Sequence, residues 1–212
     1  MQNTTGAFAR ARELGATHYE LDVHLLKDGA LCVHHDYEVG GIPLHTLTRA
    51  DLPDIPLTAH GEKPAFIPLL QDVLPVVLPE LDTLNIEIKN DDNRYAGIEK
   101  AVLNLLACEK FPLCNVLFSS FDLPTLSRLR ALCPQARIGV LTRAFDVQDA
   151  LALRAESVHL NHTRFTPQIA QICHQNGLKV YLYTVNDADL ARSLAAQGAD
   201  GIFTDCIGDF IR

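Results

Sequence analysis

The chain alternates short apolar runs with longer segments in which apolar residues recur every three or four positions. Short runs with a period of two, or with no break, are typical of β-strands, whereas the longer periodic segments are typical of helices. The pattern predicts strands at His18–His24, Leu84–Lys89, Val116–Ser119, Arg137–Leu141, Ser157–Asn161, Lys179–Val185 and Gly201–Thr204. A shorter extended piece, Leu31–His35, follows a turn at Lys27-Asp28-Gly29.

Helical patterns separate these strands. They cover Thr4–Leu14, a proline-rich stretch around Pro68–Leu78, Tyr95–Glu109, Leu123–Leu132, Val147–Arg154, Pro167–Asn176 and Ala188–Gln197. Thr166 before Pro167 is a start signal, and Gly177 and Gly198 are stop signals for the last two helices. Strands that alternate with helices of this length predict parallel βαβ units.

Two closures of such units are possible, an open doubly wound sheet and a (β/α)8 barrel. An open sheet that binds a nucleotide usually carries a G-x-G-x-x-G turn, and the sequence contains none. Acidic, histidine and polar residues instead follow several different strands, as in barrel enzymes. The sequence also opens on a predicted helix with no strand before it. We therefore expect one α/β domain over residues 1–212, a (β/α)8 TIM barrel that lacks its first strand.

Composition narrows the classes of function. No apolar stretch approaches the ~20 residues of a membrane helix, so we expect no membrane span. A net charge of −8 argues against binding of duplex nucleic acid, which usually needs a basic face. The 6 cysteines contain no C-x-x-C pair, which favours reduced thiols and a cytoplasmic location.

Charged residues stand inside two of the predicted strands. Glu20 and Asp22 are two residues apart, so their side chains point to the same face, and the same holds for Glu87 and Lys89. Charge among apolar neighbours is costly unless an opposite charge meets it. Three carboxylates with oxygen ligands predict a divalent cation, Mg²⁺ or Ca²⁺. The alternative is that each carboxylate only forms a salt bridge or caps a strand end.

Other polar residues suggest the rest of a site. His35, beside Asp36, is a candidate general acid or base, because imidazole titrates near neutral pH. Lys89 could bind a phosphate oxygen, or it could simply neutralise Glu87. Ser119-Ser120-Phe121 and Tyr183-Thr184-Val185-Asn186 could line a polar pocket, with ordinary loop packing as the alternative.

Taken in order along the chain, these motifs resemble those of the glycerophosphodiester phosphodiesterase family. The matching segments are Asn3-Thr4, Tyr19-Glu20-Leu21-Asp22-Val23, Lys27-Asp28-Gly29, Val33-His34-His35-Asp36, Ile86-Glu87-Ile88-Lys89, Ser119-Ser120-Phe121, Tyr183-Thr184-Val185-Asn186 and residues 198–205. Each segment alone is a weak signal, but E-x-D, H-D, E-x-K and T-D together are fairly specific. Residues 158–162 and 183–186 are most similar to bacterial cytoplasmic members of the family.

The resemblance implies a metal-dependent barrel enzyme that hydrolyses glycerophosphodiesters to sn-glycerol 3-phosphate and an alcohol. It implies that Glu20, Asp22 and Glu87 are metal ligands and that His35 is the catalytic acid that protonates the leaving alcohol. It further implies a substrate-binding set formed by Lys89, Ser119, Phe121 and Tyr183. The implied partner is therefore a small glycerophosphodiester.

The sequence departs from the family pattern at its beginning. Family members start with a strand that ends in His-Arg-Gly, followed by Glu-Asn-Thr, where this sequence starts with Met1 and has Gln2-Asn3-Thr4. The resemblance makes that histidine a second catalytic residue and that arginine a phosphate ligand. Two other functions therefore stay open: a catalytically impaired barrel that binds glycerol phosphate or a partner, and a phospholipase D-type enzyme that cyclises its substrate. Exposed edges of an incomplete barrel would allow oligomerisation.

Overall fold

The structure of the chain is a computed structural model. It describes residues 1–58, 64–91 and 95–210. The chain forms two compact units, Met1–Val116 and Leu117–Arg212. The expectation of a single domain stays a prediction.

The first unit is built around β1 (His18–Leu25), a long strand with two partners. It pairs in parallel with β7 (Thr83–Ile88) and antiparallel with the short β2 (Leu31–Val33). In the parallel pair, Asp22 is opposite Glu87. The side chains of Leu21, Val23, Ile86 and Ile88 are fully buried, so apolar packing fixes both strands. The two acidic strands predicted from the sequence are therefore neighbours.

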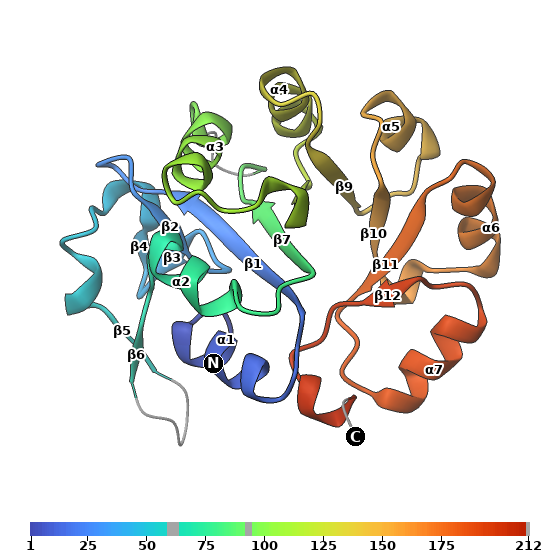
Figure 1. The fold of residues 1–212 in the computed structure, drawn as a ribbon, viewed down its shortest axis with the longest axis horizontal. Helices are drawn as coiled ribbons and strands as arrows, with labels where there is room; N and C mark the ends of the chain where they lie inside the picture. Colours follow the sequence, from blue (N-terminus) through green and yellow to red (C-terminus); the bar gives the residue numbers. More distant parts are fainter. Residues whose placement is uncertain (59–63, 92–94, 211–212) are drawn as a thin grey trace. The chain divides into compact units, whose positions relative to one another are not determined.

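The described part of this unit contains the helices α1 (Thr5–Glu13), α2 (Leu70–Val77) and α3 (Ile98–Cys108) (Figure 1). Helix α1 begins where Thr4 accepts a 3.2 Å hydrogen bond from the backbone amide of Ala7. Arg12 donates a 3.1 Å hydrogen bond to the carbonyl oxygen of Val76 and ties α1 to α2. This contact holds the segment before β1 against the body of the unit.

Between β2 and α2 the chain makes an excursion that the sequence pattern did not predict. It contains β3 (Glu38–Val39), β4 (Ile42–Pro43), β5 (Pro56–Leu57) and β6 (Ala65–Phe66), with 3-10 turns at Leu44–Thr46 and Leu52–Asp54. Leu44, Leu52 and Ile67 pack into a small apolar cluster there. Strands of two residues are too short to show a period, so tertiary packing rather than local pattern defines them.

The second unit contains five parallel strands whose order in the sheet follows the sequence. They are β8 (Val116–Ser120), which starts at the unit border, β9 (Arg137–Thr142), β10 (Ser157–Asn161), β11 (Lys179–Tyr183) and β12 (Gly201–Ile202). The helices between them are α4 (Leu123–Leu132), α5 (Val147–Ala152), α6 (Pro167–Gln175) and α7 (Ala188–Ala196). Capping side chains start these four helices, from Asp122, Asp146, Thr166 and Asp187.

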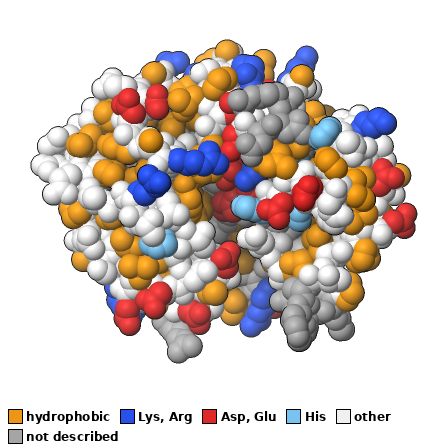
Figure 2. Space-filling model, turned by 180° about the vertical axis from the view of Figure 1, so that it is seen from behind, with side chains coloured by type: hydrophobic (Ala, Val, Ile, Leu, Met, Phe, Trp, Pro, Cys, Tyr) orange, Lys and Arg blue, Asp and Glu red, His pale blue; other side chains and the backbone are white. Residues whose placement is uncertain are grey.

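The predicted alternation of strands and helices is thus confirmed, and β10 and α4 have the predicted bounds. Most other elements end one or two residues earlier than the pattern predicted. On the face shown in Figure 2, basic side chains are interspersed with acidic and hydrophobic ones. Within the described part of the chain, no helix has both the length and the apolar character needed to cross a bilayer.

Candidate active site

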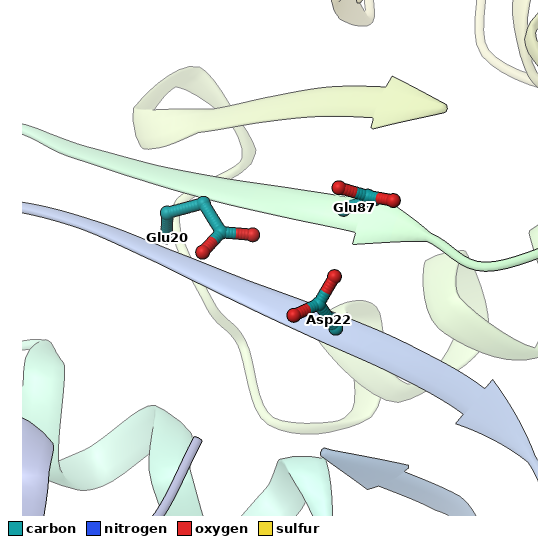
Figure 3. A group of neighbouring side chains, drawn as sticks. All are labelled: Glu20, Asp22 and Glu87. Atoms are coloured by element: carbon teal, nitrogen blue, oxygen red, sulfur yellow. The ribbon is translucent and has the colours of Figure 1, made fainter. Parts of the chain in front are cut away.

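Three carboxylates meet in the first unit (Figure 3). Glu20 and Asp22 project from β1 and Glu87 projects from the adjacent β7, and one ligand oxygen from each lies within 4.8 Å of the other two. Two features of the strands produce this arrangement. The period of two puts Glu20 and Asp22 on one face, and the parallel register puts Glu87 opposite Asp22. The three carboxylates therefore lie close together, and their predicted role as metal ligands stays a prediction.

The carboxylates are poorly solvated, which makes their mutual repulsion strong. Asp22 is 4% exposed. Burial, reinforced by the negative charge of Asp22 and opposed by Lys89, raises the pKa of Glu87 to about 7. A site that concentrates buried negative charge in this way favours a cation.

Lys89 supplies one positive charge to this cluster. Its Nζ lies 3.1 Å from Glu87 Oε1 and 3.6 Å from Asp22 Oδ1, and its side chain is 10% exposed. Burial alone would lower the pKa of Lys89, but the two carboxylates outweigh it and the pKa is raised. Lys89 therefore stays protonated at neutral pH. The predicted common face of Glu87 and Lys89 is confirmed, and both the neutralising and the phosphate-binding role remain compatible with this position.

Asn3 holds Asp22 from the other side, a role that the sequence did not indicate. Its Nδ2 donates a 2.8 Å hydrogen bond to Asp22 Oδ2, and its Oδ1 accepts one of 3.2 Å from the backbone amide of Asp22. Asn3 is buried and has a φ of 55°, a conformation that asparagine tolerates better than most residues. The only sequence signal was its place in a family-like motif.

His34 and His35 lie just beyond β2 and differ in environment. Burial lowers the pKa of His34. His35 is exposed, and its Nδ1 lies 2.7 Å from Asp36 Oδ1. This hydrogen bond lowers the pKa of Asp36. Asp36 therefore remains ionised and orients the His35 ring, while the catalytic role of His35 stays a prediction.

A group of aromatic side chains begins beside the ammonium group of Lys89. Nζ lies 5.9 Å from the centre of the Tyr37 ring, and His24 meets Tyr37 and Tyr95 edge-on. The Tyr37 hydroxyl donates to the Asp91 carboxylate and accepts a 3.1 Å hydrogen bond from the amide of Asp91. The sequence did not predict these residues as part of the site: His24 and Tyr95 stand in a predicted strand and helix, and Tyr37 and Asp91 lie in segments with no regular period. The sequence predicts only a structural role for His60, which lies outside the described residues.

The second unit brings together two other predicted residues, Phe121 and Tyr183. Their ring centres are 6.1 Å apart and their planes meet at 87°, an edge-to-face contact. Arg143, which the sequence did not single out, stacks on Phe121, with Cζ 4.2 Å from the ring centre. Ser119, by contrast, is fully buried in β8. Its substrate role therefore stays a prediction.

The donor set in the first unit fits a hard divalent cation. Mg²⁺ and Ca²⁺ bind carboxylate oxygens, and both usually keep positions for water or substrate oxygens. Three carboxylates and one ammonium group give a formal charge of −2. A divalent cation would neutralise this charge. The raised pKa of Glu87 reflects the same excess of negative charge, since burial and the charge of Asp22 both disfavour its ionised form. No soft ligand, cysteine or methionine, belongs to this group of residues.

The comparison with known proteins gives the chain its family. Residues 1–209 match the model of the glycerophosphoryl diester phosphodiesterase family. The chain belongs to this family. A glycerophosphodiester phosphodiesterase of Caldanaerobacter subterraneus is 34% identical over 216 residues, which cover 96% of this chain and 88% of that protein. One from Bacillus altitudinis is 33% identical over 219 residues, which cover 96% and 89%.

Solved structures of the family show the same fold. A glycerophosphodiester phosphodiesterase from Parabacteroides distasonis aligns with a TM-score of 0.87 at 24% identity, covering 99% of this chain and 89% of that one. A phosphodiesterase from Oleispira antarctica, in complex with the product sn-glycerol-3-phosphate, gives 0.86 at 24% identity, covering 98% and 89%. The predicted α/β class with a TIM-barrel fold is confirmed.

Proposed function

We propose that this family member hydrolyses glycerophosphodiesters to sn-glycerol 3-phosphate and an alcohol, with a divalent cation bound by Glu20, Asp22 and Glu87. The observation that carries the proposal is the meeting of three carboxylate ligands within 4.8 Å in a chain of this family. A divalent cation bound there would neutralise charge that builds on the phosphoryl oxygens during the reaction. Mg²⁺ and Ca²⁺ both suit the donors.

Lys89 and His35 have separate parts in the proposed reaction. The ammonium group of Lys89, already directed at the carboxylates, attracts the phosphodiester anion and holds one of its oxygens. Water attacks phosphorus, the bond from phosphorus to the alcohol oxygen breaks, and His35 Nε2 delivers a proton to that oxygen. The attacking water loses one proton, and His35 regains one from solvent, so water is the only reactant added. Asp36 keeps the imidazole oriented throughout.

Phe121 and Tyr183 provide the proposed contacts to the glycerol moiety. Their edge-to-face contact leaves an apolar surface suited to the carbon atoms of a small polyol. The relative from Oleispira antarctica, solved with sn-glycerol-3-phosphate, supports a ligand of this class.

The free thiols of all six cysteines agree with a reducing, cytoplasmic setting.

A direct assay tests the function. The chain is incubated with glycerophosphoethanolamine and Mg²⁺ or Ca²⁺, and sn-glycerol 3-phosphate is measured with and without EDTA. We expect product only with the cation, and a loss of at least ~100-fold in Asp22→Asn and Glu87→Gln. Glu109→Gln, a matched change of an exposed carboxylate at the end of α3, should retain full activity.

The outcomes separate the alternatives. Activity that survives EDTA would exclude the metal-dependent mechanism. A cyclic phosphate product would indicate the cyclising chemistry instead. Binding of sn-glycerol 3-phosphate with no turnover under any of these conditions would identify a binding protein rather than an enzyme.

A further inference from the structure

Residues 34–37 join β2 to β3 and carry the proposed proton donor, His35, with its partner Asp36. They form neither helix nor strand. The side chains of His35 and Asp36 are 56% and 70% exposed, so little packing holds them in place. The place of His35 relative to the carboxylates therefore depends on the two ends of this segment, His34 and Tyr37.

The backbone of the segment is hydrogen-bonded at both ends. The amide of His34 donates a 3.1 Å hydrogen bond to the carbonyl oxygen of Asp22, and the amide of Leu44 donates one of 3.0 Å to the carbonyl oxygen of Tyr37. Leu44 is fully buried in the apolar cluster of the excursion. One end of the segment is thus tied to a strand that carries carboxylates, and the other end is tied to the excursion.

The side chain of Tyr37 adds a link back to the two acidic strands. Its ring meets that of His24 edge-on, with the ring centres 5.0 Å apart and the planes at 85°. Its hydroxyl donates to the Asp91 carboxylate and accepts a 3.1 Å hydrogen bond from the Asp91 amide. His24 follows Asp22 on the same face of β1, and Asp91 lies just beyond β7. Tyr37 is therefore held from both strands that carry the three carboxylates.

His24 gives Tyr37 a fixed surface to pack against. The His24 side chain is fully buried, and its Nδ1 lies 3.0 Å from the Tyr95 hydroxyl. The backbone amide of Tyr95 in turn donates a 2.5 Å hydrogen bond to Oδ1 of the buried Asn90. The support behind the Tyr37 ring is thus part of the buried interior of the first unit, whereas His35 and Asp36 are exposed.

We propose that Tyr37 is a positioning residue that holds the His35–Asp36 pair at a fixed place relative to the three carboxylates. This inference rests on the proposed function, because His35 is assigned there as the proton donor. A general acid works only within hydrogen-bond reach of the leaving oxygen, and a misplacement of ~1 Å can cost about 100-fold in rate. Tyr37 acts through the backbone of the segment and not on the substrate itself.

Two substrates with different leaving groups test the role of Tyr37. With Mg²⁺ or Ca²⁺ present, kcat is measured for glycerophosphoethanolamine and for glyceryl 4-nitrophenyl phosphate. The ethanolamine oxygen needs a proton to leave, whereas 4-nitrophenolate leaves without one. Tyr37→Leu should lower kcat about 30-fold for the first ester and no more than about twofold for the second, which also shows that the metal site is intact. Tyr37→Phe keeps the ring and should lose only about threefold on the first ester.

Two further variants define the origin of the effect. Phe66→Leu makes a similar change at a half-exposed position on β6 and should alter neither rate. His35→Ala should show the same dependence on the leaving group as Tyr37→Leu. Because Tyr37 acts through His35, adding Tyr37→Leu to His35→Ala should cause less than about a twofold further loss. A multiplied loss in the double variant would overturn the inference.

A second measurement does not depend on turnover. In the cation-free protein, NMR relaxation gives the order parameters of the His35 and Asp36 amides, which should fall from about 0.85 to below about 0.6 in Tyr37→Leu. Unchanged order parameters would overturn the inference.

The kinetic outcomes separate the two proposals. Equal loss on both esters in Tyr37→Leu, with an active wild type, would reject only the positioning role. If the wild type hydrolysed neither ester, the enzyme function would be rejected, and the order parameters would still decide whether Tyr37 holds the segment.

Discussion

Asn3 and Asp22 are joined by two reciprocal hydrogen bonds, although 19 positions separate them in the sequence. The side chain amide of Asn3 donates to the carboxylate of Asp22 and accepts from its backbone amide. Asn3, two positions before the start of α1, thereby positions a carboxylate of the proposed metal site. This contact leads to the first prediction.

Asn3→Ala should lower the free energy of unfolding by about 2 kcal/mol, because it leaves the buried Asp22 carboxylate without that donor and puts alanine at positive φ. Urea denaturation measures the change. Asn3→Gly separates the two causes, since glycine accepts the φ of 55° and only the hydrogen bonds are lost. Asn104→Ala, on the exposed side of α3, is the matched control and should not destabilise. Equal stability of Asn3→Ala and wild type would contradict this role.

Lys89→Met should destabilise the cation-free protein by about 3 kcal/mol at pH 8, because Asp22 and Glu87 would then face each other without a counter-charge. Urea denaturation in EDTA measures the loss, and addition of Ca²⁺ should restore part of it. Lys100→Met removes an exposed ammonium from α3 and serves as the control. If the two variants were equally stable, Lys89 would not neutralise the carboxylates.

His159 should make the protein sensitive to acid. Complete burial lowers its pKa to about 3, so the folded chain keeps it neutral while the unfolded chain protonates it below about pH 6.5. The contribution of neutral His159 to the free energy of unfolding is therefore fully present above pH 6.5 and is lost as the pH falls towards 3. The expected slope is about 1.4 kcal/mol per pH unit.

The slope is measured from urea denaturation between pH 6.5 and 4, as the difference between wild type and His159→Gln. Glutamine can retain a hydrogen bond to Ser157, which lies 2.9 Å from His159 Nε2, but it does not titrate in this range. His45→Gln, at an exposed position, controls for the loss of a histidine. Parallel curves for wild type and His159→Gln would show that His159 is not the origin of the acid sensitivity.

Arg130 should stabilise the second unit by binding the segments that follow α4 and α5. It donates to the carbonyl oxygens of Pro134, Ala136, Leu153 and Arg154 at distances of 2.7 to 3.1 Å. Arg130→Ala should lower the free energy of unfolding by about 2 kcal/mol. Arg130→Lys should recover little, because one ammonium cannot match the spread of donors on a guanidinium. Thermal denaturation tests this, with exposed Arg164→Ala as the control; a full recovery by lysine would show that charge alone matters.

The sequence by itself determined the local structure and part of the site. Periodicity located the main strands and helices, because a period of two or 3.6 is a property of neighbouring residues. The same rule predicted that Glu20 shares a face with Asp22, and Glu87 with Lys89. Family-like motifs then indicated a barrel phosphodiesterase, and the family and its fold are now shown. The individual roles of the site residues stay predictions.

Only the tertiary structure decided which distant residues meet. The register of β1 against β7 places Asp22 opposite Glu87, and the packing of α1 brings Asn3 to the same carboxylate. The stacking of Arg143 on Phe121 joins residues after two different strands. None of these contacts has a signal in the local pattern. Each depends on strand pairing and packing between segments far apart in the chain, and those are fixed only when the whole core is buried.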